Sequence, residues 1–142
     1  MDALPELADS CIMDSDRQGD NRERALVAVV DDDESVRESL PDLLNEFGFR
    51  TRAFSSAEEF LASGSVEQTK CLILDVAMPG MTGLDLQRQL NDRERRIPII
   101  FITAQKDREI QDRAFKQGAV SFLYKPFSDT ALLDALNKAV EG

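Results

Sequence analysis

Short apolar runs recur five times along the chain and alternate with segments whose apolar residues follow a helical period. In the first such segment, Val36, Leu40 and Leu44 are spaced four residues apart and lie on one face of a helix. The runs between the segments have the length and the apolar character of buried strands. The pattern predicts strands at 26–30, 49–54, 71–75, 99–102 and 120–124, and helices at 34–47, 56–63, 82–91, 107–117 and 128–140.

This alternation of strands and helices predicts a parallel sheet with helices on both of its faces. Consecutive parallel strands are joined by right-handed crossovers, each of which contains a helix. The carboxyl ends of parallel strands meet at one edge of the sheet, and α/β proteins bind their ligands there. Side chains that directly follow the predicted strands are therefore the first candidates for a functional site.

Acidic residues and one lysine follow the predicted strands. Asp31 and Asp32 come after the first strand, Asp75 ends the third, and Lys125 follows the fifth. In a sheet of order 2-1-3-4-5 the first and third strands are neighbours, so their carboxylates would converge. Unit charges about 4 Å apart repel by roughly 4 kcal/mol at an effective dielectric near 20. Such a cluster needs a cation or raised pKa values, and oxygen ligands without His or Cys select Mg²⁺ or Mn²⁺.

Each of these residues also has an ordinary structural interpretation. Asp33 or Glu34 suits a helix N-terminus, where the helix dipole favours negative charge. Asp75 could start a turn, Lys125 could be a surface cation, and Thr103 could simply end the fourth strand. Taken together, at the ends of four strands, the residues favour a site for a cation and an anionic group, most simply a phosphoryl group.

Composition excludes several classes of function. The net charge of −10 argues against binding of nucleic acid. The chain has no histidine, which excludes a phosphohistidine carrier, a Ser-His-Asp hydrolase and a histidine metal site. No apolar run approaches the roughly 18 residues of a membrane span, and the first residues lack the pattern of a signal peptide. Cys71 opens an apolar run and is interpreted as a buried thiol, which fits a cytoplasmic location.

Residues 1–23 differ from the rest of the chain. Acidic residues alternate there with small and polar ones, without a sustained apolar period. We interpret residues 1–23 as an acidic, disordered leader, with a docking arm as the alternative. Residues 24–142 have a length that suits one folded domain.

Four motifs of this domain resemble those of response regulator receiver domains. They are Val29-Val30-Asp31-Asp32-Asp33, the run at 74–83 that begins Leu74-Asp75, Ile102-Thr103-Ala104, and Tyr124-Lys125-Pro126-Phe127. The resemblance covers about residues 25–141, and the runs at 33–37 and 80–86 are most similar to receivers fused to LuxR-type helix-turn-helix outputs. It implies a flavodoxin-like, doubly wound (βα)5 fold of the α/β class, with a parallel five-stranded sheet of order 2-1-3-4-5.

The resemblance implies a role in two-component signalling, as a regulator and not an enzyme. Asp75 would be the phosphoacceptor and would take a phosphoryl group from a sensor histidine kinase or a histidine phosphotransfer protein. Asp31, Asp32, Asp75 and the backbone carbonyl of Ala77 would bind Mg²⁺, for which Mn²⁺ could substitute. Lys125 would pair with a phosphoryl oxygen.

The resemblance also assigns switch residues and an output surface. Thr103 would donate its hydroxyl to the phosphoryl group, and Phe122, three residues before the lysine, would turn inward in response. The bond that precedes Pro126 is expected to be cis. The surface of 107–117, 120–124 and 128–140 would change for an output protein or for a second copy of the chain. Transcription would be the regulated process, with no direct contact between this chain and nucleic acid or a membrane.

Two other functions remain open at this point. An interaction module that works without phosphorylation would share the receiver fold. A Mg²⁺-dependent phosphatase would use Asp75 or Asp31 as its nucleophile, but the Lys125-Pro126 ending and the chain length fit it poorly. The sequence also leaves open whether the chain is a single-domain receiver or part of a longer regulator.

Overall fold

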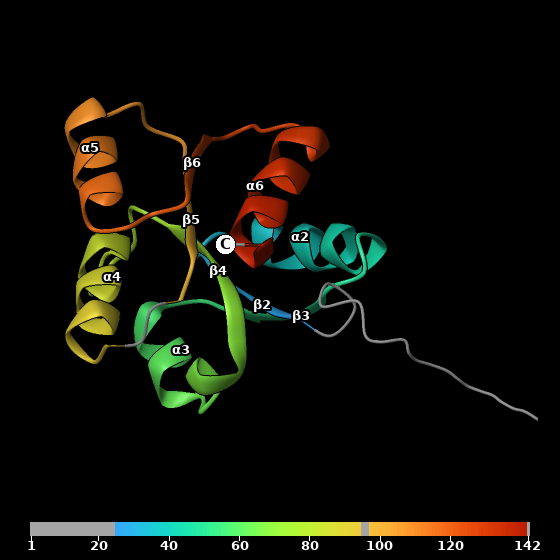
Figure 1. Ribbon diagram of the computed structural model, residues 1–142, viewed down its shortest axis with the longest axis horizontal. Helices are drawn as coiled ribbons and strands as arrows, with labels where there is room; N and C mark the ends of the chain where they lie inside the picture. Colours follow the sequence, from blue (N-terminus) through green and yellow to red (C-terminus); the bar gives the residue numbers. More distant parts are fainter. Residues whose placement is uncertain (1–24, 95–96, 142) are drawn as a thin grey trace, which may run out of the picture.

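The computed structural model describes residues 25–94 and 97–141, which form a five-stranded parallel sheet between two layers of helices (Figure 1). The predicted leader lies outside these residues. The strands are β2 (Leu26–Val30), β3 (Arg50–Phe54), β4 (Thr69–Asp75), β5 (Ile99–Thr103) and β6 (Ser121–Tyr124). Their order is β3-β2-β4-β5-β6, which is the predicted order 2-1-3-4-5. The prediction of a flavodoxin-like, doubly wound fold is therefore confirmed.

All five predicted helices are present in the described part of the chain. They are α2 (Glu34–Glu46), α3 (Ala57–Ala62), α4 (Gly83–Asp92), α5 (Arg108–Lys116) and α6 (Asp129–Glu141). A short 3-10 helix, η1 (Val66–Gln68), precedes β4 and was not predicted. The ends of the predicted helices and strands differ from the observed ends by at most two residues.

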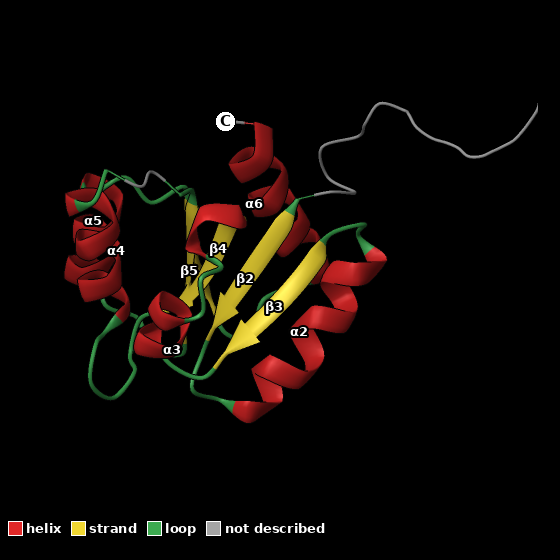
Figure 2. Ribbon diagram, turned by 90° about the horizontal axis from the view of Figure 1, so that it is seen from below, coloured by secondary structure: helices red, strands yellow, loops and turns green. Residues whose placement is uncertain are grey.

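The two faces of the sheet carry separate halves of the core. α2 and α6 cover one face, where Leu44 and Leu136 are fully buried, while α3, α4 and α5 cover the other, where Phe60 and Leu90 are buried (Figure 2). β2 and β5 are buried along their whole length, which explains why their sequences are continuously apolar. Each fully buried Leu or Phe side chain contributes about 1.5–3 kcal/mol. The packing of the two helix layers against the sheet therefore fixes the sheet edge at which the candidate residues lie.

None of the helices within residues 25–94 and 97–141 combines the length and the hydropathy needed to cross a bilayer.

Candidate functional site

The candidate site lies at the carboxyl ends of four strands. Asp31 follows β2, Asp75 ends β4, Thr103 ends β5 and Lys125 follows β6. The first three side chains are buried, and that of Lys125 is 21% exposed. The parallel sheet thus brings together residues that are far apart in the sequence, such as Asp31 and Lys125, which are 94 positions apart.

Three carboxylates form the acidic part of the site. Asp31, Asp32 and Asp75 each offer one oxygen, and these oxygens all lie within 4.8 Å of one another. Asp31 and Asp75 are buried, whereas Asp32 is exposed to solvent. Mg²⁺ prefers oxygen ligands and keeps several waters, so a partly open set of carboxylates suits it. The three carboxylates predicted as metal ligands are close enough together to share one ion.

Asp31 is held by hydrogen bonds to three of its atoms. Its carboxylate accepts one from the backbone N–H of Asp33 (2.9 Å) and one from Nζ of Lys125 (2.8 Å). Its backbone carbonyl accepts another from Nη1 of Arg37 (3.0 Å). Hydrogen bonds to charged groups are stronger than neutral ones, so these contacts fix the orientation of Asp31.

Asp75 stands in surroundings that disfavour its charged form. Burial raises the pKa of Asp75, and the charge of Asp31 raises it further. Lys125 opposes this effect only in part, so the pKa of Asp75 reaches about 7, against an ordinary value of 3.8. Strongly shifted pKa values gather at functional sites. A bound cation would relieve the repulsion between the carboxylates, so the electrostatics of the site also fit a metal ion.

Lys125 provides the positive charge of the site. Burial by itself lowers the pKa of Lys125, but its hydrogen bond to Asp31 and the charges of Asp31 and Asp75 raise the pKa above the ordinary lysine value. Its backbone N–H donates to the carbonyl of Thr103 (2.7 Å), which ties the end of β6 to that of β5. The Lys125–Pro126 peptide bond is cis. The ammonium group therefore stays charged beside the carboxylates.

A small cavity adjoins the site beside β5. It has a volume of about 40 Å³, and Ala77, Thr103 and Phe122 are among the residues that line it. The hydroxyl of Thr103 accepts a hydrogen bond from the backbone N–H of Gln105 (3.2 Å). The ring of Phe122 is half-buried, with its centroid 5.9 Å from that of Phe101. The two expected switch residues thus share one cavity next to the acidic cluster.

One structural interpretation of the site is confirmed, and two of its features were not predicted from the sequence. Asp33 caps α2 by accepting a hydrogen bond from the backbone N–H of Ser35 (2.9 Å), so its structural interpretation is the right one. The guanidinium of Arg37 donates a hydrogen bond to the backbone carbonyl of Asp31. In the sequence, only the position of Arg37 early in the helix could have indicated this contact. Gly83 begins α4 so close to β4 that a Cβ atom there would overlap the carbonyl oxygen of Asp75. The sequence does not indicate this close contact, because the contact depends on how α4 packs against the sheet.

Most of the chain is similar to known proteins in sequence and in structure. Residues 27–137 match the response regulator receiver domain. Nodulation protein W of Bradyrhizobium diazoefficiens is 49% identical over 118 residues, which are 83% of this chain and 52% of that protein. The transcriptional regulatory protein FixJ of Rhizobium meliloti is 42% identical over 115 residues, 81% of this chain and 56% of that protein. The solved structure of the response regulator StyR has a TM-score of 0.78 and 48% identity, and the match covers 83% of this chain and 60% of that one.

The matched region contains the whole candidate site. Asp31, Asp32, Asp75, Thr103 and Lys125 all lie within residues 27–137. The chain spans about half the length of the curated relatives that it matches. The family model covers well over half of the chain, and the strand order is the one expected for this fold. The chain belongs to the response regulator receiver domain family.

Proposed function

We propose that this chain is a phosphorylation-controlled receiver that accepts a phosphoryl group from a histidine kinase, or from a histidine phosphotransfer protein, on Asp75. The observation that carries the proposal is the meeting of Asp31, Asp32 and Asp75 with Lys125 at one edge of the sheet. Three acids and one fixed cation suit a phosphoryl group bound together with a divalent metal. Membership of the receiver family supports the same function.

The proposed reaction is phosphoryl transfer from a phosphohistidine to a carboxylate. An oxygen of Asp75 attacks the phosphorus, and a P–O bond forms while the P–N bond to the donor imidazole breaks. The electron pair of the broken bond stays on the imidazole nitrogen, and the product is an acyl phosphate on Asp75. Since Asp75 itself is modified, the chain serves as a regulator and not as an enzyme that releases a product.

Asp31, Asp32, Asp75 and the backbone carbonyl of Ala77 would hold Mg²⁺, or Mn²⁺ in its place. The bound ion would supply neutralisation of the charge on the phosphoryl oxygens. The role of the protein is to keep its carboxylates together, and the 2.8 Å ion pair with Lys125 does this for Asp31. These groups position the reactants, and phosphoryl transfer needs little else from a protein.

Lys125 and Thr103 would respond to the phosphorylated state. The ammonium group of Lys125 would pair with a phosphoryl oxygen, and the hydroxyl of Thr103 would donate a hydrogen bond to another. The Thr103 hydroxyl accepts from the N–H of Gln105, so its own hydrogen can be directed to a new acceptor. A shift of Thr103 would change the cavity that it shares with Phe122, and the ring of Phe122 would follow.

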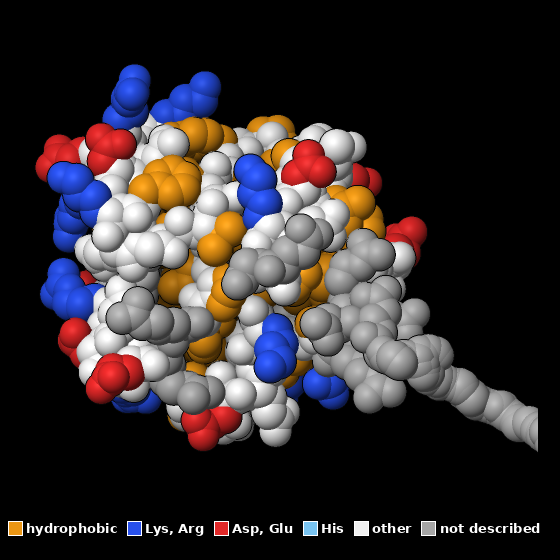
Figure 3. Space-filling view, in the orientation of Figure 1, with side chains coloured by type: hydrophobic (Ala, Val, Ile, Leu, Met, Phe, Trp, Pro, Cys, Tyr) orange, Lys and Arg blue, Asp and Glu red, His pale blue; other side chains and the backbone are white. Residues whose placement is uncertain are grey.

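The surface of α5, β6 and α6 is the proposed output face. Phe115 of α5 is 42% exposed, and its ring centroid lies 6.5 Å from that of Phe122. Apolar side chains are visible at the surface between α5 and β6 (Figure 3). A movement of Phe122 would therefore reach an exposed apolar surface directly. An output protein or a second copy of the chain would bind there.

Control of transcription is the proposed output. A matched relative is named a transcriptional regulatory protein, and the chain spans 56% of its length. We place the process in the cytoplasm. The net charge of −10 disfavours direct binding of nucleic acid by this chain, so DNA would be bound by an output protein or by another domain of a longer regulator.

Intact-mass spectrometry after treatment with acetyl phosphate tests the proposed function. The wild type should gain one phosphate in the presence of Mg²⁺ and none in EDTA, and Asp75→Asn should gain none in either. Asp92→Asn, which changes an exposed aspartate of α4, serves as the matched control and should behave like the wild type. A wild type that stays unmodified with Mg²⁺ would overturn the proposal and favour an interaction module without phosphorylation.

A further inference from the structure

The loop between β4 and α4, residues 76–82, is fixed at both of its ends. The backbone N–H of Val76 donates to the carbonyl of Ile102 (3.1 Å), and the Val76 carbonyl accepts from the N–H of Gly83 (3.0 Å). At the other end, Thr82 and Asp85 form a reciprocal capping box that starts α4. Ala77, whose carbonyl is a proposed metal ligand, lies between these two anchors and is exposed.

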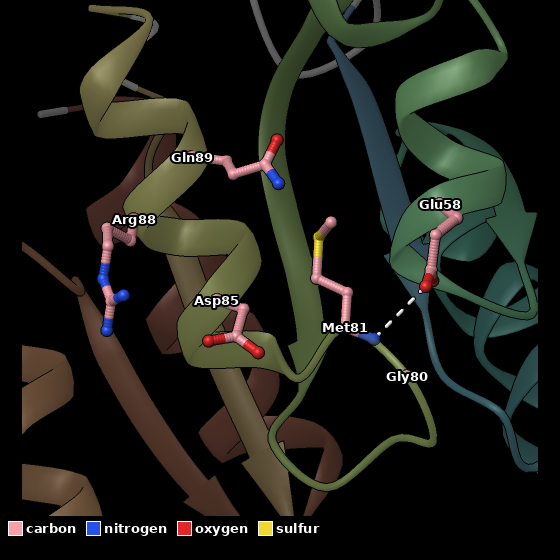
Figure 4. A pocket seen from close by; sticks show the side chains of 6 residues that line it. All are labelled: Glu58, Gly80, Met81, Asp85, Arg88 and Gln89. Carbon is pink, nitrogen blue, oxygen red and sulfur yellow. Dashed lines mark hydrogen bonds between the residues drawn. The ribbon is translucent and has the colours of Figure 1, made fainter.

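The middle of this loop is linked by one hydrogen bond to a side chain of another element. Oε2 of Glu58 accepts a hydrogen bond from the backbone N–H of Met81 at 3.2 Å (Figure 4). Among the described residues, this is the one hydrogen bond that links residues 77–81 to another element. Met78 adds a buried apolar contact but no hydrogen bond. Glu58 therefore restrains the loop on the side of Ala77 that is opposite to the Val76 anchor.

Helix α3 holds Glu58 in a defined position. Glu58 belongs to the first turn of α3, between Ala57 and Phe60, which are fully buried. The hydroxyl of Ser56 caps this turn by accepting from the N–H of Glu59 (3.0 Å). A short helix that is capped and anchored in the core holds its side chains at defined positions, so Glu58 can hold a loop that is 23 residues further along the chain.

The backbone at Gly80 is shaped to admit this carboxylate. Gly80 has a φ of +76°, which glycine adopts without strain, and a Cβ atom there would lie 2.8 Å from Oε2 of Glu58. Glu58, Gly80 and Met81 line an open groove of about 430 Å³ between α3 and α4, with Arg88 and Gln89 on its other wall (Figure 4). The hydrogen bond lies at this groove and joins α3 to the loop that leads into α4.

We propose that Glu58 is a positioning residue for the metal site, because it fixes the loop that presents the Ala77 carbonyl. The inference rests on the proposed function, in which that carbonyl is a ligand. Without Glu58, the loop keeps more conformational freedom, which the ion must then restrict when it binds. Loss of the Glu58 carboxylate should therefore weaken the affinity for the metal ion. It should not change the rate of phosphorylation once the ion is bound.

The test measures Mg²⁺ affinity by calorimetry on the unphosphorylated protein. Glu58→Ala should weaken binding by about two- to tenfold, the change that one exposed hydrogen bond supports. Glu58→Gln should bind like the wild type, because its amide oxygen accepts the same bond without the charge. Glu59→Ala, one residue away, also removes a carboxylate, but that carboxylate bonds to Ser55 and not to the loop. It should leave the affinity unchanged.

Two further readouts separate positioning from folding and from the proposed function itself. The melting temperature of Glu58→Ala in EDTA should match that of Glu59→Ala, and its rate of acetyl phosphate labelling at saturating Mg²⁺ should stay within about twofold of the wild type. Equal Mg²⁺ affinity in Glu58→Ala and the wild type would overturn the inference, as would equal losses in all three variants, which would indicate a general effect of charge. If the wild type itself neither bound Mg²⁺ nor accepted phosphate, the proposed function would fail instead.

Discussion

Asp75 is the residue at which burial and charge combine most strongly. Burial and the neighbouring charge of Asp31 both raise the pKa of Asp75, and the charge of Lys125 offsets only part of this rise. Asp31 differs because its carboxylate accepts hydrogen bonds from Lys125 and from the backbone of Asp33. Two aspartates of the same cluster therefore have different environments. Asp31 is held in place by hydrogen bonds, whereas Asp75 is available to bind a ligand or to form a covalent bond.

Replacement of Asp75 by Asn should stabilise the metal-free protein in a pH-dependent way. Because the folded-state pKa of about 7 exceeds the ordinary 3.8, the native state binds more protons than the unfolded state between these values. The wild type therefore loses stability as pH rises from about 4 to 7, and Asp75→Asn does not. Urea unfolding in EDTA at pH 8 should show a gain of about 1–3 kcal/mol, less than the full shift implies because solvent screens part of the charge. The gain should nearly vanish at pH 4, and an equal gain at both pH values would contradict the account.

Thr103→Ala should uncouple phosphorylation from switching. A change from 1:99 to 99:1 in a two-state equilibrium needs about 5.5 kcal/mol, and one charge-assisted hydrogen bond supplies about 1.5–3 of it. The variant should accept phosphate on Asp75 but switch only in part, as measured by hydrogen exchange in α5 with and without acetyl phosphate. Thr103→Ser keeps the hydroxyl and should switch like the wild type. Complete switching in Thr103→Ala would show that Lys125 and the metal suffice.

At the scale of elements, the contact between α4 and the end of β4 sets the position of the phosphoacceptor. Gly83→Ala would place a methyl group against the carbonyl oxygen of Asp75 and close to the ring of Phe101. Overpacking of this kind costs about 1–3 kcal/mol, although Ala is otherwise the better helix former. Urea unfolding should show this loss. Arg88→Ala, at an exposed position of α4, should be nearly neutral as the control. Wild-type stability in Gly83→Ala would mean that α4 can shift without cost.

The sequence predicts the elements well and their side-chain contacts less well. The apolar runs and periods identify every strand and α-helix of the described residues, because burial in a parallel sheet imposes those patterns. The spacing of Ser56 and Glu59 is typical of a capping box, and the Ser56 hydroxyl does accept from the N–H of Glu59. The Glu59 carboxylate, however, accepts from the N–H of Ser55 and not from that of Ser56. The hydrogen bond from Met81 to Glu58 could not be predicted, since it joins two elements that only the folded sheet brings together. Sequence patterns within one segment predict its secondary structure, whereas contacts between elements can be identified only once the fold is known.

At the scale of the whole molecule, the topology makes the candidate site predictable. β2 and β4 are neighbours in the sheet, so Asp31 and Asp75 meet although 43 residues separate them (75 − 31 − 1). Lys125 reaches them because β6 ends at the same edge. The parallel sheet thus determines which residues gather. Their distances and pKa values follow from packing and burial, which no pattern in the sequence specifies.

Removal of residues 1–23 should leave the folded domain intact. The five-stranded sheet and the two core clusters described above lie within residues 25–94 and 97–141. A shortened chain that starts at residue 24 should therefore unfold at the same urea concentration as the full chain and accept phosphate at the same rate. A marked loss of stability would contradict the prediction that residues 1–23 are a separate leader.

The central claim is that Asp75 carries the phosphoryl group, and chemical trapping tests it most directly. The protein is treated with acetyl phosphate and Mg²⁺, the acyl phosphate is reduced with borohydride, and peptide mass spectrometry locates the residue that has become homoserine. The account predicts homoserine at position 75 alone, formed with Mg²⁺ and absent in EDTA. Homoserine at position 31 or 32, or at no position, would contradict it.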